Sequence, residues 1–435
     1  MTDVQICIAA LVFLPVLLLL RFPVAVALGL VSIGGIAAIF GWKIALGVLT
    51  AIPHEVIASW TLTSVPMFLF MGFICHHANL TDGLFDAARV WLSKLPGGLA
   101  VATIGAGAGF SAVTASSVAC AATLGRIATP AMLKQGYDPK IAAGTSAAAG
   151  TIGSMIPPSI LLLLYGIYVE VPIGPLFLAG FLPGLLTAAM FSAVIIFAAL
   201  IKPQLAPRVL NQVTWSERFS ALGRIWPTLL LIIGVFGGLF SGFFTATEAG
   251  AVGAFLSLVI AAGMRTLNMR TLLAAFRETL LTTASIFVIA ISANLLTRLL
   301  ALGGFTDWLS SAVVGEGLGQ FQILLIIAVV CILLGMFLDS LGIMLLTLPI
   351  FLPMLEGASI DLIWFGIVMV KLLEIGLLTP PVGLNVFVVK GVLKDVVSTQ
   401  AIFLGVTWFI LADLVTLTLL MLFPQIALFL PSLLR

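Results

Sequence analysis

The chain has 435 residues, of which 62% are hydrophobic and only 8% charged, and its formal net charge is +2. An ordinary soluble protein has about 25% charged residues because its surface needs polar cover. This composition excludes a soluble globular domain, and the nearly neutral charge gives no sign of a nucleic-acid partner. Apolar runs of about 20 residues, enough to span the hydrocarbon core of a bilayer, recur along the whole sequence. The sequence therefore predicts an all-α, polytopic protein in a lipid bilayer.

The N-terminal part of the chain is predicted to contain four apolar segments. It lacks the basic region of a signal peptide, so the first apolar run is predicted to be a retained span. Arg21 and Pro23 interrupt the apolar character and separate two short helices. The predicted segments cover about 4–20, 23–40, 44–58 and 60–80.

The pattern changes to that of an amphipathic helix between Asp82 and Lys94. Apolar side chains recur there at helical spacing, and charged residues occupy other positions. We expect this segment to lie in the membrane interface rather than to cross the bilayer. The apolar positions are Leu84, Phe85, Ala88, Trp91 and Leu92.

Small residues dominate the stretch from Pro96 to Pro130, which would let helices approach closely in lipid. Further spans are predicted over about 141–200. Residues 202–224 form the most polar stretch and are interpreted as a connecting loop, whose basic excess places it on the cytoplasmic side. Two spans later, a second basic cluster is expected on the same face, at Arg265, Arg270 and Arg277. About ten to thirteen membrane segments, some of them half-length, fit the whole chain.

Two stretches of the sequence match at a constant offset of 223 residues (376 − 153 = 223). Ile152-Gly153 matches Ile375-Gly376, and Pro157-Pro158 matches Pro380-Pro381. These residue types shape backbones and bind ligands, so the match predicts an internal repeat. Upstream, the matching pairs are Ser117 with Ser340, Pro130 with Pro353, Asp138 with Asp361, and the polar pair Ser116 with Asp339.

Each repeat contains a Gly-x-x-x-Pro-Pro segment within an apolar helix. Paired prolines remove amide donors and clash with preceding carbonyls, and the glycine permits torsions that other residues avoid. We therefore predict two discontinuous helices, unwound at these joints. Irregular backbone at membrane depth persists only where it is buried or lines a cavity. Its free carbonyls can coordinate a small cation, and half-helix N-termini attract an anionic substrate.

Two polar clusters upstream of the joints look like the tips of helical hairpins. Residues 110–124 carry several hydroxyls, and residues 333–347 carry Asp339 between glycines. Their apolar arms are short enough to enter and leave by the same side, which predicts two re-entrant hairpins. Together with the broken helices they would form a pseudo-symmetric site. In the alternative interpretation, the prolines only kink packed helices and the serines join them.

Several charged residues lie in apolar surroundings. Asp339 is a candidate functional residue because an intramembrane carboxylate is costly, although a hairpin tip can also reach water. Lys371 and Glu374, three residues apart, are predicted to pair on one helix face.

Other polar residues have less certain roles. Arg126 could meet a substrate carboxylate, but we interpret it as a side chain that reaches toward the membrane interface. His76-His77 could couple protons, but a membrane-boundary pair is the preferred interpretation. The pattern assigns no role to Asp413. The four cysteines have neither metal-ligand nor disulfide spacing and are expected to be small buried apolar residues; they are Cys7, Cys75, Cys120 and Cys331.

Motifs in both halves follow one order along the chain. The first half contains Pro96-Gly97-Gly98-Leu99-Ala100, Ser116-Ser117-Val118-Ala119, Gly136-Tyr137-Asp138, Ala148-Ala149-Gly150-Thr151-Ile152-Gly153, Ile156-Pro157-Pro158-Ser159-Ile160 and Tyr165-Gly166. The second half contains Gly335-Met336 through Asp339, Leu348-Pro349-Ile350 and Thr379-Pro380-Pro381-Val382-Gly383-Leu384-Asn385. Over essentially its whole length, the chain resembles the large membrane subunit of tripartite ATP-independent periplasmic (TRAP) transporters.

This resemblance implies a fold and a mechanism that spacing does not show. Family members have inverted repeats, a scaffold domain and a mobile transport domain around two hairpins, and they work as sodium-coupled elevators. On this plan the chain divides into N-terminal scaffold helices with the interfacial helix (1–95), a first transport-domain repeat (96–201), a cytoplasmic linker (202–224), second scaffold helices (225–318), a second transport-domain repeat (319–395) and a C-terminal helix (396–435).

The resemblance also implies a function, partners and a location. The chain would be the permease subunit of a symporter in the bacterial inner membrane, beside a small four-helix membrane subunit. A periplasmic substrate-binding protein would deliver an organic acid, such as a C4-dicarboxylate, a sialic acid or a related carboxylate. Na⁺ would be the coupling ion. No organic cofactor and no enzymatic activity are implied.

Carried over by motif, the family's sites fall on three groups of residues. The first sodium site would use mainly carbonyls, at Ser111, Gly153, Ile156 and Pro158. The second sodium site would use Gly335, Gly376, Thr379 and Val382. Substrate would lie between the hairpin tips, near Ser116, Ser117, Ser159 and Asp339. Hard cations want oxygen ligands, which backbone carbonyls at broken helices supply.

Other functions fit the residues less well. His54-Glu55 begins like a zincin helix, but Ala58 stands where the second zinc histidine belongs. The sequence has no phosphate loop of the G-x-x-x-x-G-K-[ST] type and no nucleophile elbow. A permease with a separate nucleotide-binding subunit would not explain paired hairpins. The closer alternative is a stand-alone sodium–carboxylate symporter of similar fold, and a channel is a third class.

Overall fold

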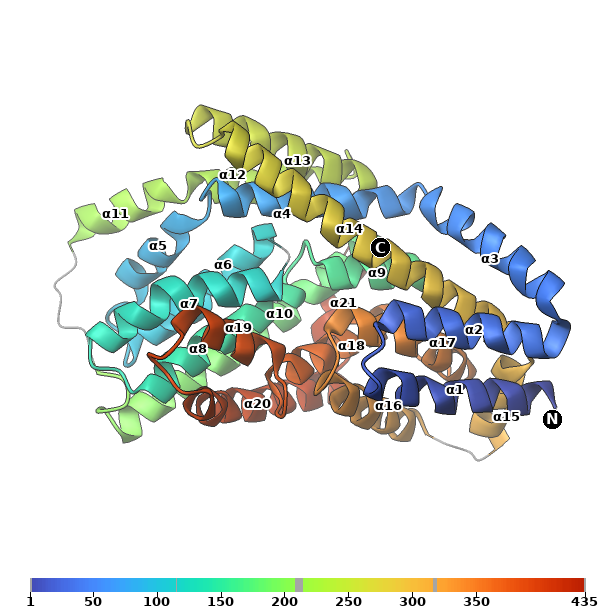
Figure 1. Cartoon of the computed structure of the whole chain (residues 1–435). Coiled ribbons are helices and arrows are strands. Elements are labelled where there is room, and N and C mark those ends of the chain that lie inside the picture. The colour runs from blue at the N-terminus through green and yellow to red at the C-terminus, as the bar shows by residue number, and fades with distance from the viewer. Residues whose placement is uncertain (1, 115, 208–213, 316–318, 434–435) are drawn as a thin grey trace.

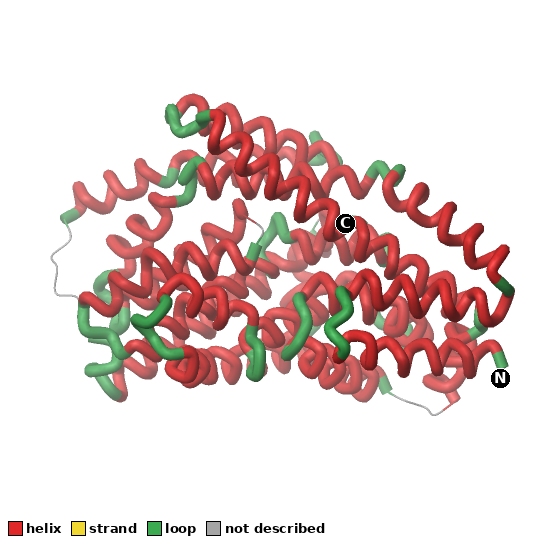
Figure 2. The backbone as a smooth tube through the Cα atoms, viewed as in Figure 1, coloured by secondary structure: helices red, strands yellow, loops and turns green. Residues whose placement is uncertain are grey.

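The computed structural model describes residues 2–114, 116–207, 214–315 and 319–433. Every regular element within these ranges is a helix, as Figures 1 and 2 show. The all-α architecture predicted from the sequence is therefore confirmed. The first half of the chain contains α1 (Asp3–Leu19), α2 (Val24–Phe40), α3 (Trp42–Ile57), the short 3₁₀ helix η1 (Thr61–Thr63), α4 (Ser64–His77), α5 (Asp82–Leu92), α6 (Gly98–Thr114), α7 (Ser117–Lys134), α8 (Pro139–Thr151), the 3₁₀ helix η2 (Ile152–Ser154), α9 (Ile160–Tyr168) and α10 (Ile173–Ile201).

The second half repeats this order with one long helix in place of a bent pair. It contains α11 (Trp215–Arg224), α12 (Trp226–Phe240), α13 (Ala246–Gly263), α14 (Met269–Leu302), α15 (Phe305–Gly315), α16 (Gln320–Gly335), α17 (Ser340–Gly357), α18 (Leu362–Leu378), α19 (Leu384–Leu393), α20 (Thr399–Leu422) and α21 (Gln425–Ser432). α14 takes the place that α3 and α4 occupy in the first half, where the chain bends by 59°.

Helix bounds recur at the offset that the sequence motifs gave. Both ends of α17 lie 223 residues after those of α7 (340 − 117 and 357 − 134), and both ends of α15 lie 223 residues after those of α5 (305 − 82 and 315 − 92). Six further pairs agree to within four residues at each end: α1 with α12, α2 with α13, α6 with α16, α8 with α18, α9 with α19 and α10 with α20. The internal repeat therefore extends well beyond the motifs and covers nearly the whole chain.

Matching side chains begin the matching helices. Asp138 caps α8 by accepting a 2.8 Å hydrogen bond from the Lys140 amide, and Asp361 caps α18 by accepting one of 2.8 Å from the Trp364 amide. These caps satisfy amides that have no partner inside the helix. The two aspartates that match in sequence thus have the same structural function.

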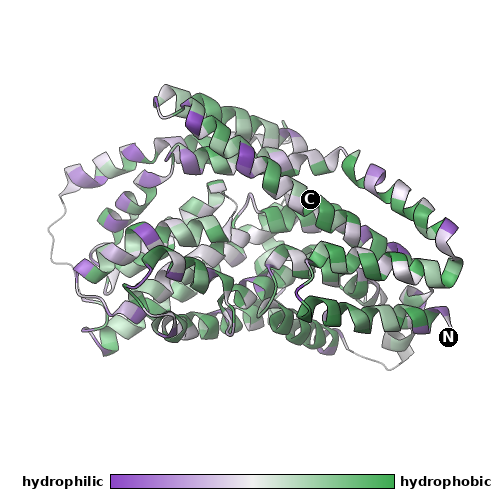
Figure 3. Ribbon diagram, viewed as in Figure 1, coloured by the Kyte–Doolittle hydropathy of each residue, from purple (hydrophilic) through white to green (hydrophobic). Residues whose placement is uncertain are grey.

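The helices carry the apolar surface of a multi-pass membrane protein (Figure 3). Within the described residues, five helices are long and apolar enough to cross a membrane, or up to seven spans result if each of two bent pairs counts as one. The bent pairs are α3 with η1 and α4, and α11 with α12. Shorter apolar helices of 10–17 residues, among them α6 and α16, are not counted among these spans. Hydrophilic residues gather on α5 and α11 at one end of the molecule (Figure 3).

The interpretation of residues 202–224 as a loop is wrong for the last ten of them, because α11 is helical. Its start is fixed by a capping box, in which Thr214 accepts from the Glu217 amide at 3.3 Å and the Glu217 carboxylate accepts from the Thr214 amide at 2.8 Å. These hydrogen bonds from Thr214 hold the pKa of exposed Glu217 below its usual value. Residues 208–213 of the predicted loop lie outside the described residues.

A buried ion cluster joins α18 to α10 and α20. The predicted pairing of Lys371 with Glu374 is confirmed, at 3.0 Å, and both side chains are 0% exposed. Lys371 also donates to the Thr187 hydroxyl at 3.0 Å and to the Asp413 carboxylate. Asp413, to which the sequence assigned no role, is therefore a partner of this lysine. Removing one partner of such a buried pair typically costs about 3–5 kcal/mol.

Candidate functional site

Both Gly-x-x-x-Pro-Pro segments interrupt their helices. α8 passes into η2, which ends at Ser154, and helix resumes only at Ile160. In the second half, α18 ends at Leu378 and α19 begins at Leu384. Both Pro-Pro peptide bonds are cis. The structure thus contains the two discontinuous helices that the sequence predicted.

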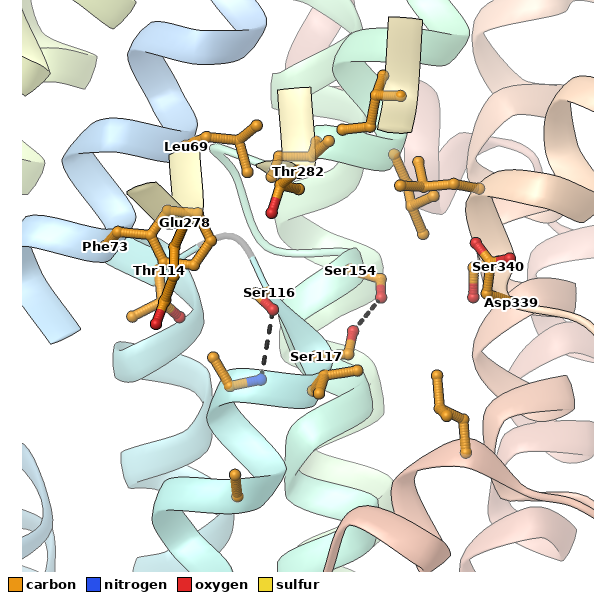
Figure 4. Close-up of a pocket in the computed structure, with 18 of the residues that line it drawn as sticks. Leu69, Phe73, Thr114, Ser116, Ser117, Ser154, Glu278, Thr282, Asp339 and Ser340 are labelled. Carbon is orange, nitrogen blue, oxygen red and sulfur yellow. Dashed lines mark hydrogen bonds between the residues drawn. The ribbon is translucent and has the colours of Figure 1, made fainter. Parts of the chain in front are cut away.

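A cavity of about 540 Å³ lies between these interruptions and the start of α7 and α17. This volume falls within the range of small-molecule sites, which is about 300–1,000 Å³. Figure 4 shows Ser116, Ser117 and Ser154 on one side, and Asp339 with Ser340 across from them. Three of the four residues proposed for substrate, Ser116, Ser117 and Asp339, therefore line one cavity although they lie far apart in sequence.

The hydroxyl wall of the cavity is built by the N-terminus of α7. Ser116 has extended backbone (φ −131°, ψ 114°) and caps the helix by accepting from the Ala119 amide at 3.3 Å. Ser117 lies one residue further, and its hydroxyl is 2.5 Å from the Ser154 hydroxyl at the first interruption. A helix N-terminus carries partial positive charge, so this wall favours an anionic group.

The opposite wall is built by the N-terminus of α17. Asp339 caps it by accepting from the Gly342 amide at 3.1 Å through Oδ2. Next to it, Ser340 is 8% exposed, and its hydroxyl has no hydrogen-bond partner in the described chain. Asp339 and Ser116 are thus equivalent caps in the repeat, but only Asp339 carries charge. Its carboxylate can attract a cation, and the unpartnered hydroxyl can bind a polar ligand.

Ser159 lies elsewhere. It caps α9 by accepting from the Leu162 amide at 3.2 Å, and its hydroxyl donates to the Ser154 carbonyl. It is 1% exposed and is not among the described residues that line the cavity. In this structure Ser159 therefore shapes the interruption, and Ser154 presents a hydroxyl to the cavity in its place.

Helices α4 and α14 also contribute residues to the lining of this cavity (Figure 4). Leu69, Phe73 and His76 come from α4, while Glu278 and Thr282 come from α14. The Glu278 carboxylate lies 3.2 Å from His77 Nε2. This wall was not predicted from the sequence, because neither helix carries a motif there. The adjacent histidines were its only visible signal.

The residues proposed for the first sodium site gather around the end of α6. Ser111 donates to the Gly107 carbonyl at 2.5 Å, and a Cβ added to Gly153 would lie 3.1 Å from the Ser111 hydroxyl. Pro158 lines the same small space as Ala112 and Val113 of α6. Ile156 instead packs on α10, where a Cβ added to Gly184 would lie 2.5 Å from its side chain. This entire interruption is buried.

The residues proposed for the second sodium site are arranged differently. Gly335 and Gly376 are back to back, since a Cβ added to Gly376 would lie 2.8 Å from the Gly335 Cα. Thr379 ends α18, and its hydroxyl donates to the Ile375 carbonyl at 2.6 Å. Val382 is 37% exposed. The second interruption therefore meets α16 through two glycines and leaves its proline tip at the surface.

Comparison with known proteins identifies the family. Residues 11–426 match the family model "Tripartite ATP-independent periplasmic transporter, DctM component". The chain belongs to this family. It is 36% identical over 337 residues to the C4-dicarboxylate TRAP transporter large permease protein DctM of Pseudomonas aeruginosa, an alignment covering 77% of this chain and 78% of that one.

A second relative has a longer chain. The sialic acid TRAP transporter permease protein SiaT of Haemophilus influenzae is 32% identical over 377 residues, which cover 86% of this chain and 60% of SiaT. The fold also resembles a solved transporter, YdaH of Alcanivorax borkumensis, with a TM-score of 0.58 at 15% identity; the match covers 87% of this chain and 89% of that one. The TRAP large subunit predicted by the motifs is thus confirmed, as a multi-pass membrane protein of a transporter family.

Proposed function

We propose that this chain is the large permease subunit of a sodium-coupled TRAP transporter that imports an organic acid across the bacterial inner membrane. The substrate would be a C4-dicarboxylate, a sialic acid or a related carboxylate. A periplasmic binding protein would deliver it, and the small four-helix membrane subunit would complete the transporter. The observation that carries the proposal is the 540 Å³ cavity, where two helix N-termini and both interruptions meet.

The charged residues that line the main cavity support the proposal that an organic acid is transported together with cations. Among the described residues no lysine or arginine lines this cavity, while Asp339 and Glu278 do. An anionic substrate would therefore rely on the N-terminus of α7, its hydroxyls and co-bound sodium for compensation. Carbonyls at the two interruptions, with the Ser111 and Thr379 hydroxyls, are oxygen ligands suited to a hard cation. Sodium would be co-transported with the substrate.

The proposed mechanism is an elevator. α6–α7 and α16–α17 would be re-entrant hairpins whose tips carry Ser116 and Asp339. Sodium would order both tips and complete the pocket, after which this body would slide past the scaffold wall of α4 and α14. Four of the seven described lining residues that α4 and α14 contribute are apolar, namely Leu69, Phe73, Leu281 and Ile286, and such side chains form no hydrogen bonds that sliding would break.

Reconstitution tests the proposal. The chain, the small subunit and the binding protein are placed in proteoliposomes, and uptake of labelled succinate and sialic acid is measured under a sodium gradient. We expect accumulation above the external concentration that requires both sodium and the binding protein. Uptake without the binding protein would instead indicate the stand-alone symporter, and mere equilibration would indicate a channel.

Sodium binding has its own measurement. The melting temperature of the purified chain in detergent is followed against sodium, with potassium at equal ionic strength as control. A ligand that binds only the folded state raises stability by mass action. A saturable, sodium-selective rise is expected, and equal responses to both salts would contradict sodium sites.

A further inference from the structure

A second cavity, of about 190 Å³, lies between the α4–α5 connection and the first proposed hairpin. Its walls come from α4, α5, α6 and α7, so the proposed scaffold and transport domain both contribute. The lining residues are His76, Asn79, Thr81, Asp82, Phe110, Thr123, Arg126 and Ile127.

This cavity adjoins the main one. His76 lines both, and Phe110 and Thr123 belong to the same two helices as Thr114 and Ala119 of the main cavity. The two cavities therefore share a wall at His76. The second cavity also lies near the linker, since Asp86 of α5 is 3.8 Å from Arg224 at the end of α11. On the proposed topology that end faces the cytoplasm.

Arg126 and Asp82 are the two side chains of opposite formal charge among the described residues that line the second cavity. Among the described residues Arg126 is the only lysine or arginine that lines either cavity. No carboxylate of the described chain forms an ion pair with it, although Asp82 lines the same space. The guanidinium keeps its five donors available for a carboxylate, which it can bind in bidentate fashion.

The repeat shows that the fold does not require this polarity. The equivalent positions in the second half carry no charged or hydroxyl side chain. Three of them, Leu299, Phe305 and Leu346, are buried in one hydrophobic cluster, against which Ile350 packs. Arg126 itself corresponds to Pro349. The same place in the helix plan is therefore apolar and partly buried in one half, with Leu302 and Leu333 exposed, and a polar cavity in the other. The eight equivalents are Leu299, Leu302, Gly304, Phe305, Leu333, Leu346, Pro349 and Ile350.

We propose that Arg126, with His76, Asn79 and Thr123 around it, forms an anion-binding station for the substrate carboxylate between the main cavity and the cytoplasmic side. The inference rests on the proposed function for its physiological ligand. Because the main cavity has no lysine or arginine among its described lining, Arg126 is the first fixed cation that a departing carboxylate meets. The station attracts the anion out of the main cavity and thereby favours release.

The charge of the cavity is tested without transport. Asn79→Cys places a thiol in the cavity wall, in a chain whose four native cysteines are buried. Its reaction rates with an anionic and a cationic methanethiosulfonate are compared in detergent, normalised to Ser241→Cys, an exposed position that lines neither cavity. We expect the anionic reagent to be favoured, and Arg126→Gln to lower that preference by about tenfold. A preference that Arg126→Gln leaves unchanged overturns the station.

Transport then tests its role. In the reconstituted three-component system, Arg126→Gln should lower kcat for succinate uptake by about tenfold, because a hydrogen-bonded ion pair is lost, while Arg126→Lys keeps an intermediate rate. Lys134→Gln, with the same charge change on the same helix outside both cavities, is the matched control. Equal rates for the Arg126→Gln and Lys134→Gln variants contradict the role. If the unmodified chain shows no uptake but the cysteine in the second cavity still prefers the anionic reagent, the proposed function is refuted and the anion site stands.

Discussion

The two interruptions occupy equivalent places in the repeat, yet their surroundings differ. The first, after α8, is buried throughout and surrounded by hydroxyls of Ser111, Ser117 and Ser159. The second, after α18, leaves Pro380, Pro381 and Val382 exposed. About two turns before it lies Lys371 of the buried ion cluster, and the equivalents of Lys371 and Glu374 in the first half are Ala148 and Thr151. The repeat keeps the interruption in both halves but the charges in only one. Hydroxyl groups therefore surround the first interruption, and a buried ion cluster lies near the second.

The largest effect is expected from removing the charge of Lys371 near the second interruption. Lys371→Met leaves two fully buried carboxylates without their common partner, so the free energy of unfolding should fall by about 3–5 kcal/mol. Denaturant unfolding in detergent measures it. Lys140→Met, at an exposed lysine of the equivalent helix α8, is the control and should stay within about 0.5 kcal/mol. Equal losses for both variants would mean that the cluster does not hold the second joint.

The glycines at the two joints provide the next contrast. A Cβ at Gly376 would meet the Gly335 backbone at 2.8 Å, whereas one at Gly153 would meet the Ser111 hydroxyl at 3.1 Å. Backbone yields less than a side chain, so Gly376→Ala should lower stability by about 1–3 kcal/mol and Gly153→Ala by less. β-Branched residues should be worse at both positions. The melting temperatures decide the order, and a reversed order would contradict the packing described.

The two equivalent caps sharpen the comparison at the cavity. Asp339→Ala removes the only charged cap that faces the main cavity among the described residues and should lower sodium-driven uptake by at least about tenfold. Ser116→Ala should have a smaller effect on uptake. Each loses a cap worth about 1 kcal/mol, so their melting temperatures should fall alike. Thr379→Ala should also lower uptake. Normal uptake in both the Asp339→Ala and Thr379→Ala variants would remove the proposed site.

The smallest effect concerns the segment between the halves. The lowered pKa of Glu217 means that its cap stabilises α11 fully above the ordinary glutamate pKa, and that this stabilisation is lost as pH falls through the lowered value. In Thr214→Ala the pKa should return toward the ordinary value. Carboxyl titration by NMR measures the difference, and an unchanged pKa would show that Thr214 does not cause the shift.

Much of the fold follows from local sequence. Apolar run lengths predicted the short helices that flank Arg21 and Pro23, and amphipathic spacing predicted α5, because helical periodicity acts over a few residues. Matched Gly, Pro, Ser and Asp positions predicted both interruptions and the repeat. The helix of residues 215–224 was missed although Trp215, Phe219 and Leu222 recur at helical spacing, because its charged residues and the prolines before it favoured a loop.

Tertiary structure decided which distant residues share a site. The sequence could name Ser116, Ser117 and Asp339, but not that α4 and α14 close the same cavity, since no motif marks a wall made by packing. It could pair Lys371 with Glu374 at helical spacing, but Asp413 and Thr187 come from other helices. Hydropathy and backbone-shaping residues act over a few positions, so their effects can be predicted from the sequence. The partners of a buried charge depend on how helices meet, which only the folded arrangement determines.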